Sequence, residues 1–375
     1  MARLARGKYL HPQTVQIVHT VHRCVRRAFL CGHDPVTGKS HEHRRQWIRN
    51  RLEFLASVFG IDCLTYAVLS NHLHLVLRSR PDVVRSWSDE EVARRWLRLF
   101  PERHTAGGDP AKPNKGELQA ITGDPRRLAE LRIRLSDISW WARCTAENIG
   151  RAANREDGCT GHFWEGRYKA QLILDEPSLL ACAMYVDLNP IRAALAQTPE
   201  ESTYTGARER IDDLKQGFFS SSSSPSSRTK CKKKKQDKPT RPTHDWERSR
   251  RRLCSGWLSP VEINEKSDPA GANVSHCGRR ASLKGFLSIS LTRYLDLLDW
   301  TGRQLRSDKR GSIPSQLAPI LERLGIDSRG WCDLVSKFGR LFKRAAGSPE
   351  SLSREAARRG NSWMQGPGCD WLRAG

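Results

Sequence analysis

Apolar and polar positions follow two different rhythms along the first eighty residues. Residues 14–31 are rich in valine and other strand formers and predict a first strand before a Gly-rich turn. Residues 40–59 carry apolar side chains at helical spacing and predict a helix. Two short apolar runs, residues 61–69 and 72–77, are separated by two turn residues and predict a tight antiparallel hairpin. The predicted order is strand, helix, strand, strand.

The middle of the chain interrupts this pattern and then resumes it. Residues 80–158 are highly charged and mostly helical in pattern, which predicts an inserted helical segment. Residues 161–175 predict a returning strand. The apolar segment that follows predicts a helix that ends or kinks at Asn189, because Pro190 restricts the residue before it. These elements predict an α+β fold in which helices flank a central antiparallel sheet.

A change in composition divides the remainder of the chain. Residues 216–250 are rich in serine and lysine, and a segment of this composition cannot bury a core, so we expect a disordered basic linker. Residues 251–375 regain helical periodicity and predict a separate helical C-terminal region of unknown role. Residues 1–215 are then the first domain of the protein.

The charge of the chain indicates a class of partner. The 375 residues include 64 Lys and Arg against 41 Asp and Glu, a formal net charge of +23, which favours a polyanion such as nucleic acid. Twelve of the basic residues and three acidic ones lie between residues 228 and 252. We expect this segment to make sequence-independent phosphate contacts. Its densest cluster is Lys232, Lys233, Lys234 and Lys235.

Cysteine usage and hydropathy indicate a compartment. The eleven cysteines include no CxxC pair and are odd in number, which argues against a zinc ribbon and a disulfide framework and fits reducing cytosol. The basic N-terminal segment lacks the apolar core of a signal peptide, and no run of about 18 uncharged apolar residues occurs. The sequence therefore predicts a cytoplasmic protein that does not span a membrane.

Two histidines open the second strand of the predicted hairpin. On a strand His72 and His74 project from the same face, so their imidazoles form a bidentate platform for a divalent metal. An isolated pair of this kind is more often polar surface. A second pair, His41 and His43, lies at a predicted helix start, where the two side chains diverge, and is interpreted as a solvated face.

The helix before Pro190 supplies possible partners for these histidines. On a helix Tyr185 and Asn189 share one face, so a phenol and an amide oxygen could project together towards the histidine pair. Packing of the ring is the commoner role of a helical tyrosine. The two interpretations differ in whether the hydroxyl faces a site.

Three motifs, LSNHLHLVL, GHFWEGRYK and YVDLNPIRA, resemble in this order the single-tyrosine HUH transposases, specifically the REP-associated tyrosine transposases of bacteria. The resemblance covers residues 15–202, around half of the chain. It implies an HUH endonuclease fold, which is ferredoxin-like or RRM-like, with Tyr185 as the nucleophile. It also implies that His72, His74 and Asn189 bind a divalent metal ion, Mg or Mn.

The same resemblance implies a reaction and a substrate. The expected activity is that of a transposase, a metal-dependent single-strand DNA endonuclease and strand transferase that passes through a covalent 5′-phosphotyrosine. The expected partner is single-stranded or hairpin DNA, such as a repetitive extragenic palindrome, in the bacterial nucleoid. The sequence leaves open whether a monomer or a homodimer acts.

Further residues near these motifs are candidate DNA contacts. Arg167, Lys169 and Arg192 are candidates for phosphate binding. Trp164 could stack on an unpaired base or pack in the core. Tyr168 is a rival nucleophile in a strand-like segment, where packing or a backbone contact with DNA is expected instead.

Two alternative functions remain open at this point. The first is a non-catalytic protein that retains the fold in order to bind hairpin DNA. The second is a metallohydrolase that activates water at the histidine pair, for which Asp62 and Asp187 are the available carboxylates. Formation of a covalent DNA adduct separates the proposed transposase from the first alternative, and dependence on Tyr185 separates it from the second.

Overall fold

The structure is a computed structural model that describes residues 10–25, 30–34, 37–222, 256–263, 271–304 and 328–366. The lysine cluster Lys232, Lys233, Lys234 and Lys235 lies outside these residues, as does most of the expected linker.

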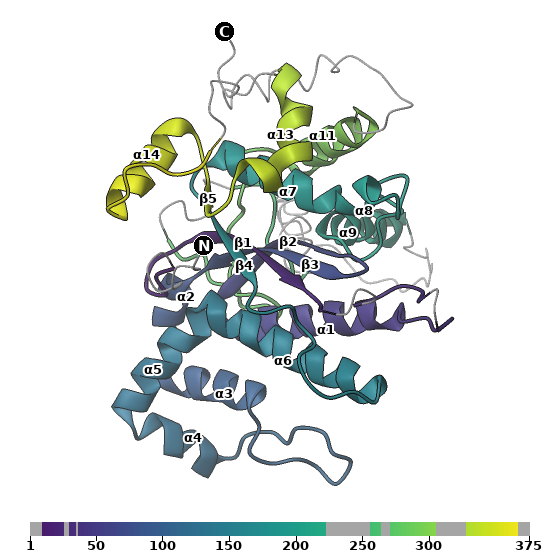
Figure 1. Cartoon of the computed structure of the whole chain (residues 1–375). Helices are drawn as coiled ribbons and strands as arrows, with labels where there is room; N and C mark the ends of the chain where they lie inside the picture. The colour runs from purple at the N-terminus through teal and green to yellow at the C-terminus, as the bar shows by residue number, and fades with distance from the viewer. Residues whose placement is uncertain are drawn as a thin grey trace, which may run out of the picture.

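The described residues form an α+β fold around one sheet with the strand order β2-β3-β1-β4-β5 (Figure 1). The strands β1 (Ile17–Arg23), β2 (Ile61–Val68), β3 (His72–Ser79) and β4 (Lys169–Ile173) pair in antiparallel fashion, as the alternating patterns predict. The short strand β5 (Ala345–Ala346) pairs with β4 in parallel. The four strands β1 to β4 form the antiparallel sheet that the sequence predicts, and the C-terminal strand β5 makes the whole sheet mixed.

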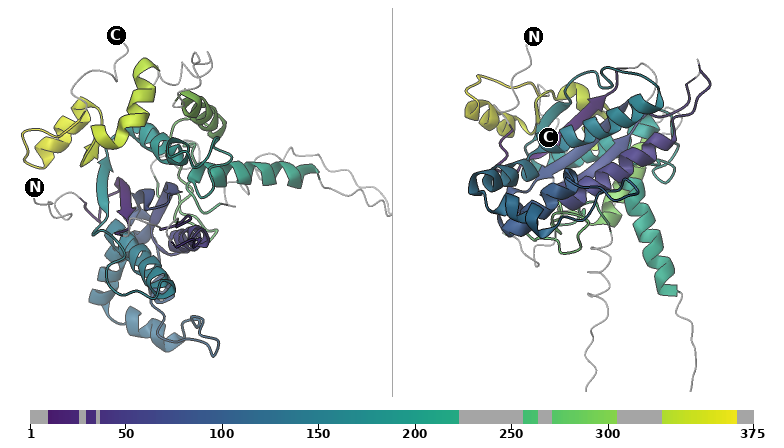
Figure 2. Two further views of the ribbon diagram at one scale, coloured as in Figure 1. Left: turned by 45° about the vertical axis from the view of Figure 1, so that its right-hand side comes forward. Right: turned by 90° about the horizontal axis from the view of Figure 1, so that it is seen from below.

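Helices cover both faces of the sheet. The helices α1 (His43–Val58) and α6 (Ile138–Glu156) lie on one face, where they also contact each other (Figures 1 and 2). The helix α7 (Glu176–Asp187) lies on the other face, against β2 and β3, and is itself covered by α13 (Ser328–Leu341). Buried apolar side chains from all of these elements form one core.

The remaining helices are short or peripheral. The inserted segment comprises α2 (Pro81–Arg85), α3 (Asp89–Leu99), α4 (Lys115–Thr122) and α5 (Pro125–Ser136), which lead into α6. Side chains at the N-caps explain where several of these helices begin, since each cap satisfies amide groups that the first turn leaves unpaired. These caps are Ser88 for α3, Asn114 for α4, Asp124 for α5 and Asp137 for α6.

After α7 the chain turns at Leu188, and α8 (Asn189–Arg192) begins at the expected break before Pro190. The helix α9 (Gly206–Ser222) projects away from the sheet (Figure 2). The helices α11 (Leu291–Gln304) and α14 (Pro349–Arg358) lie towards the C-terminus.

The described C-terminal residues share the core of the sheet. Trp257, Phe286 and Phe338 are almost fully buried within the same apolar cluster as the strands. The backbone amide of Leu172 in β4 donates to the carbonyl of Arg344 beside β5. A separate C-terminal region was expected from the low-complexity segment, but the described part of this region packs on residues 10–222 instead.

A buried network of ion pairs and hydrogen bonds around Asp62 links the β2–β3 hairpin to the C-terminal residues. The carboxylate of Asp62 accepts hydrogen bonds from Arg78 at 2.8 Å, from Arg80 at 3.1 Å and from the Ser282 hydroxyl at 2.8 Å. Burial alone would raise the pKa of Asp62, but the charges of Arg78 and Arg80 lower it. Arg78 also donates to the carbonyl of Gly285 at 2.7 Å. The open end of the β2–β3 hairpin, opposite its turn, is thereby bonded to residues 282–285.

These contacts predict the effect of a truncation. We expect a chain that ends at Gln216 to lose cooperative thermal unfolding, because α7 and β4 lose their apolar cover. Each large apolar side chain that loses its cover costs roughly 1.5–3 kcal/mol. Near-ultraviolet circular dichroism during heating measures this, with a chain ending at Gly366 as the control. A truncated protein that unfolds as sharply as the control contradicts the shared core.

Candidate active site

One face of the sheet gathers polar side chains from three neighbouring strands. In the antiparallel register His19 of β1 lies opposite Gln171 of β4, and Val21 of β1 lies opposite His74 of β3. Because side chains alternate between the two faces of a strand, His19, His74 and Gln171 all lie on the face that α7 covers. The side chain of His19 therefore meets those of His74 and Gln171, which are 55 and 152 positions away from it in the sequence.

A cavity of about 320 Å³ opens on this face. Four basic residues and one acidic residue line it, so its interior favours an anion such as a phosphate. The acidic residue, Glu165, lies 3.8 Å from the guanidinium of Arg23. The polar and charged lining comprises His19, His72, His74, Gln171, Tyr185, Arg23, Glu165, Arg167, Lys169 and Lys343.

Burial lowers the pKa of all three histidines of the cavity, which favours their neutral form. Burial lowers the pKa of His19 to about 4, although the hydrogen bond with Gln171 opposes this shift. Burial and the nearby charges of Arg23 and Lys169 lower the pKa of His72 to about 4. Burial, with smaller effects of its neighbours, lowers the pKa of His74 well below its usual value. Neutral imidazoles have a lone pair, which metal binding requires.

One buried nitrogen of the cavity histidines has no hydrogen-bond partner among the described residues. The Nδ1 atom of His74 lies 2.9 Å from Nε2 of His19. The Nε2 atom of His74 is buried and makes no hydrogen bond with any described residue. A buried polar atom without a partner is costly, so this nitrogen is available to accept a ligand. The histidine pair therefore fits a metal ion in the donor atoms that it offers.

Tyr185 stands beside these histidines on α7. Its ring meets His74 edge to face at a centroid distance of 5.6 Å and His19 at 6.0 Å. The ring also contacts Phe338 at a centroid distance of 5.8 Å and the guanidinium of Arg192 at 5.0 Å. The structure thus brings His72, His74 and Tyr185 to one cavity, as the motif spacing predicts.

The C-terminal helix α13 forms one wall of the cavity. A Cβ atom on Gly339 would lie 3.1 Å from the Tyr185 hydroxyl oxygen, so the two elements approach closely at this point. Arg192 donates to the carbonyl of Ser336 at 2.6 Å and so links α8 to α13. Gly339, Phe342 and Lys343 line the cavity. No motif marks these residues, so they could not be predicted from the sequence.

The predicted third metal ligand is placed less favourably than the histidines. Asn189 begins α8 and is 8% exposed, and its Nδ2 atom has no partner among the described residues. It does not belong to the residues that line the cavity. Its role as a ligand therefore stays a prediction.

The predicted DNA contacts divide into two groups. Arg167 and Lys169 are exposed at the cavity and free to meet a phosphate. Arg192 is instead engaged by Tyr185 and Ser336. Trp164 is half-buried and donates from Nε1 to the carbonyl of Ala146 at 2.8 Å, which favours packing over base stacking.

The opposite face of the sheet holds the rival tyrosine. Tyr168 is buried, its hydroxyl lies 3.1 Å from Ser139 Oγ, and its ring stacks on His22 at 5.3 Å. His22 projects away from the cavity because it is three residues after His19 on the same strand. These contacts agree with a packing role for Tyr168.

The second histidine pair contacts the end of α6. His41, Glu156 and Asp157 place one possible ligand atom each within 4.8 Å of one another. His43 Nε2 lies 2.8 Å from Glu156, and the Arg44 guanidinium binds both carboxylates. A solvated face was expected for His41 and His43, but both also contact acidic side chains at the end of α6. A metal at this cluster would compete with Arg44.

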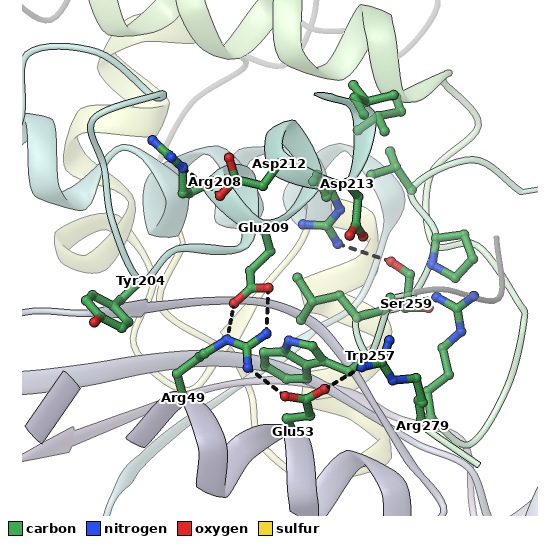
Figure 3. A pocket seen from close by; sticks show the side chains of 18 of the residues that line it. Arg49, Glu53, Tyr204, Arg208, Glu209, Asp212, Asp213, Trp257, Ser259 and Arg279 are labelled. Atoms are coloured by element: carbon green, nitrogen blue, oxygen red, sulfur yellow. Dashed lines mark hydrogen bonds and ion pairs between the residues drawn. The ribbon is translucent and has the colours of Figure 1, made fainter. Parts of the chain in front are cut away.

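A larger cavity of about 630 Å³ lies beside α1 and α9 (Figure 3). Arg49 stands between Glu53 and Glu209 there, with ion pairs of 2.6 and 2.7 Å. Arg279 also binds Glu53, at 3.2 Å. These four charges are therefore paired with one another.

The fold and the cavity define an α+β protein with a histidine–tyrosine site on one face of a mixed sheet. No family model matches the chain, and no curated protein matches it. A solved structure described as "Structure of the REP associates tyrosine transposase bound to a REP hairpin" is similar, with 12% identity, 57% of this chain and 88% of that chain covered, and a TM-score of 0.34. This likeness is too distant to carry a conclusion about function.

Within the described residues, no helix combines the length and the apolar character that crossing a bilayer requires.

The approach of α13 to Tyr185 predicts an energetic coupling. Replacement of a helical glycine by alanine normally stabilises a protein by about 0.5–1 kcal/mol. We expect Gly339→Ala to gain less than this in the wild-type chain, because the new methyl group crowds the Tyr185 hydroxyl. The gain should return in a Tyr185→Phe background, with a coupling of about 0.5–1 kcal/mol. Denaturant unfolding measures it.

The matched control for this double-mutant cycle is Tyr168→Phe, which removes a hydroxyl from the opposite face. The effect of Gly339→Ala should be the same with and without Tyr168→Phe. Equal effects of Gly339→Ala with and without Tyr185→Phe would show that the hydroxyl does not rest against α13.

Proposed function

We propose that the protein is a transposase-like enzyme that cleaves and rejoins single-stranded DNA through Tyr185. The observation that carries this proposal is the position of the Tyr185 phenol beside two neutral histidines, in a cavity lined by four basic residues. A nucleophile, possible metal ligands and phosphate-binding cations are thereby close together. The resemblance of the three sequence motifs to the REP-associated tyrosine transposases supports the same assignment.

The proposed reaction exchanges one phosphate ester for another. The Tyr185 phenolate attacks the scissile phosphorus, the new bond joins phosphorus to the phenolic oxygen, and the bond from phosphorus to the 3′ oxygen breaks. The departing oxygen takes the electron pair and a proton and becomes a free 3′-hydroxyl. A 5′-phosphotyrosine remains, and because bond energy is conserved, attack by a 3′-hydroxyl can reverse the step.

The proposed cofactor is a divalent metal ion, Mg or Mn, held by His72 and His74, with Asn189 as the proposed third ligand. The unpartnered Nε2 atom of His74 supports this assignment. A bound ion would polarise the scissile phosphate and offset the charge of the transition state. The two histidines would hold such an ion on the sheet, because both are on β3, which pairs with β1 and β2.

The cavity also supports a preference for unpaired DNA. Arg23, Arg167, Lys169 and Lys343 line it and would neutralise the phosphates that flank the scissile one. A cavity of about 320 Å³ has room for the scissile phosphate and its sugar, and an unpaired nucleotide reaches it without the cost of unpairing and unstacking a base. We therefore propose single-stranded or hairpin DNA as the substrate, with the scissile strand outside the paired stem.

The water-using metallohydrolase is less well supported, because its two carboxylates have other partners. Asp62 is bonded to Arg78, Arg80 and Ser282. Asp187 accepts from Thr65 at 2.5 Å and from Tyr294 at 2.6 Å. Neither carboxylate lines the cavity that holds His74.

The proposed nucleophile predicts a specific loss. Tyr185→Phe should abolish covalent adducts with an end-labelled DNA hairpin in Mn²⁺, while Tyr168→Phe, the matched control from the opposite face, should form them normally. Denaturing gels measure the adduct, and digestion of the protein shows which DNA end carries the peptide. We expect a peptide on the 5′ end. A non-catalytic hairpin-binding protein would bind the hairpin and form no adduct.

Three results would each exclude the proposed mechanism. They are undiminished cleavage by Tyr185→Phe, a peptide on the 3′ end, and equal activity on fully paired duplex.

The cations of the cavity predict an effect on salt dependence. Lys343→Gln should weaken binding of hairpin DNA and reduce the slope of log K against log salt concentration by about 0.7, the value for one lost phosphate contact on a single strand. Lys337→Gln is the matched control, because Lys337 pairs with Asp333 at 2.9 Å and does not line the cavity. Equal slopes for the two variants, measured by fluorescence anisotropy, would remove Lys343 from the site.

A further inference from the structure

His19 and His74 are joined edge to edge. Their ring planes differ by 9°, their centroids are 5.2 Å apart, and Nε2 of His19 lies 2.9 Å from Nδ1 of His74. Rings stacked face to face would stand about 3.5 Å apart, so their nitrogens could not approach this closely. The two imidazoles therefore lie nearly in one plane and share an N–H···N hydrogen bond.

The direction of this bond follows from the next residue in the chain of contacts. The carbonyl oxygen Oε1 of Gln171 lies 3.3 Å from Nδ1 of His19. With the Gln171 amide in this orientation, its oxygen accepts, so Nδ1 of His19 carries the hydrogen and Nε2 of the ring is the acceptor. His74 must then donate from Nδ1, which leaves the lone pair of His74 on Nε2, the buried nitrogen without a partner.

His72, at the turn of the β2–β3 hairpin, also has its Nδ1 atom beside a side-chain amide oxygen. Its Nδ1 atom lies 2.5 Å from the side-chain oxygen Oδ1 of Asn71. Because this oxygen also accepts, His72 donates from Nδ1 and has its lone pair on Nε2. The two histidines of the HxH motif are thus held in the same tautomer by different neighbours.

We propose that His19 is a positioning residue which, with Gln171, holds His74 in the tautomer that presents Nε2 to the cavity. The inference rests on the proposed function, because the divalent ion proposed there is the ligand that Nε2 would bind. His19 is not itself a ligand in this arrangement, since both of its ring nitrogens are engaged. Hydrogen bonds of this kind fix the orientation of a metal-binding histidine and raise its basicity.

The full-length protein can be tested by titration with Co²⁺, followed by visible absorption, without any DNA. His19→Leu removes the acceptor for His74 and should weaken Co²⁺ binding by about 10–100-fold. His19→Gln should recover part of the affinity, because its amide oxygen can accept from His74 Nδ1. His22→Leu, a substitution of a buried histidine on the opposite face of the same strand, is the matched control and should leave the affinity unchanged.

A second measurement reports the tautomer directly. In metal-free protein labelled with ¹⁵N-histidine, the signals lost in His74→Ala identify His74, and its ¹⁵N shifts should be those of the Nδ1–H form. In His19→Leu the ring should lose this preference. A His74 that is protonated on Nε2 in the wild-type chain overturns the inference, even where His19→Leu is too unstable to titrate.

The outcomes separate this inference from the proposed function. If His74→Ala binds Co²⁺ as the wild type does, the proposed metal site is wrong. If His74→Ala loses Co²⁺ but His19→Leu retains it, the metal site stands and the positioning role of His19 is wrong. Tyr185→Phe should bind Co²⁺ normally, which keeps the nucleophile out of the comparison.

Discussion

The pairing of β1 with both β3 and β4 is the constraint on which the candidate site depends. This strand joins two segments that are about a hundred residues apart, and its register places His19 between His74 and Gln171. A shift of one residue would turn His19 to the other face, where His22 now packs with Tyr168.

The second requirement is the cover that the C-terminal region provides. The helix α13 packs on α7, and its Phe338 and Gly339 enclose Tyr185. Farther along the sheet, Asp62 accepts a hydrogen bond from Ser282 of the C-terminal region. It also binds Arg78 of β3 and Arg80. A charge that is so completely buried is stable only with its partners, so this network fixes how the C-terminal residues meet the hairpin.

Much of the candidate site could be predicted because its signals are local. Alternation along β3 is enough to place His72 and His74 on one face, and the break at Pro190 marks the end of the helix that bears Tyr185. His19 was missed although it lies in the predicted first strand, since a single histidine in an apolar strand has no distinguishing pattern. Gln171 and Lys343 were missed because a single glutamine or lysine has no distinguishing pattern in the sequence.

The sequence by itself determined the order of strands and helices, the α+β class and the residue types that could act on a phosphate, because these follow from periodicity, turn chemistry and motif spacing. Tertiary structure alone decided which residues meet. Strand register brought His19 to His74, and burial made the histidines neutral. Parallel pairing of β5 with β4 joined the C-terminal region to the sheet, because backbone hydrogen bonds between distant segments leave no periodic trace in the chain.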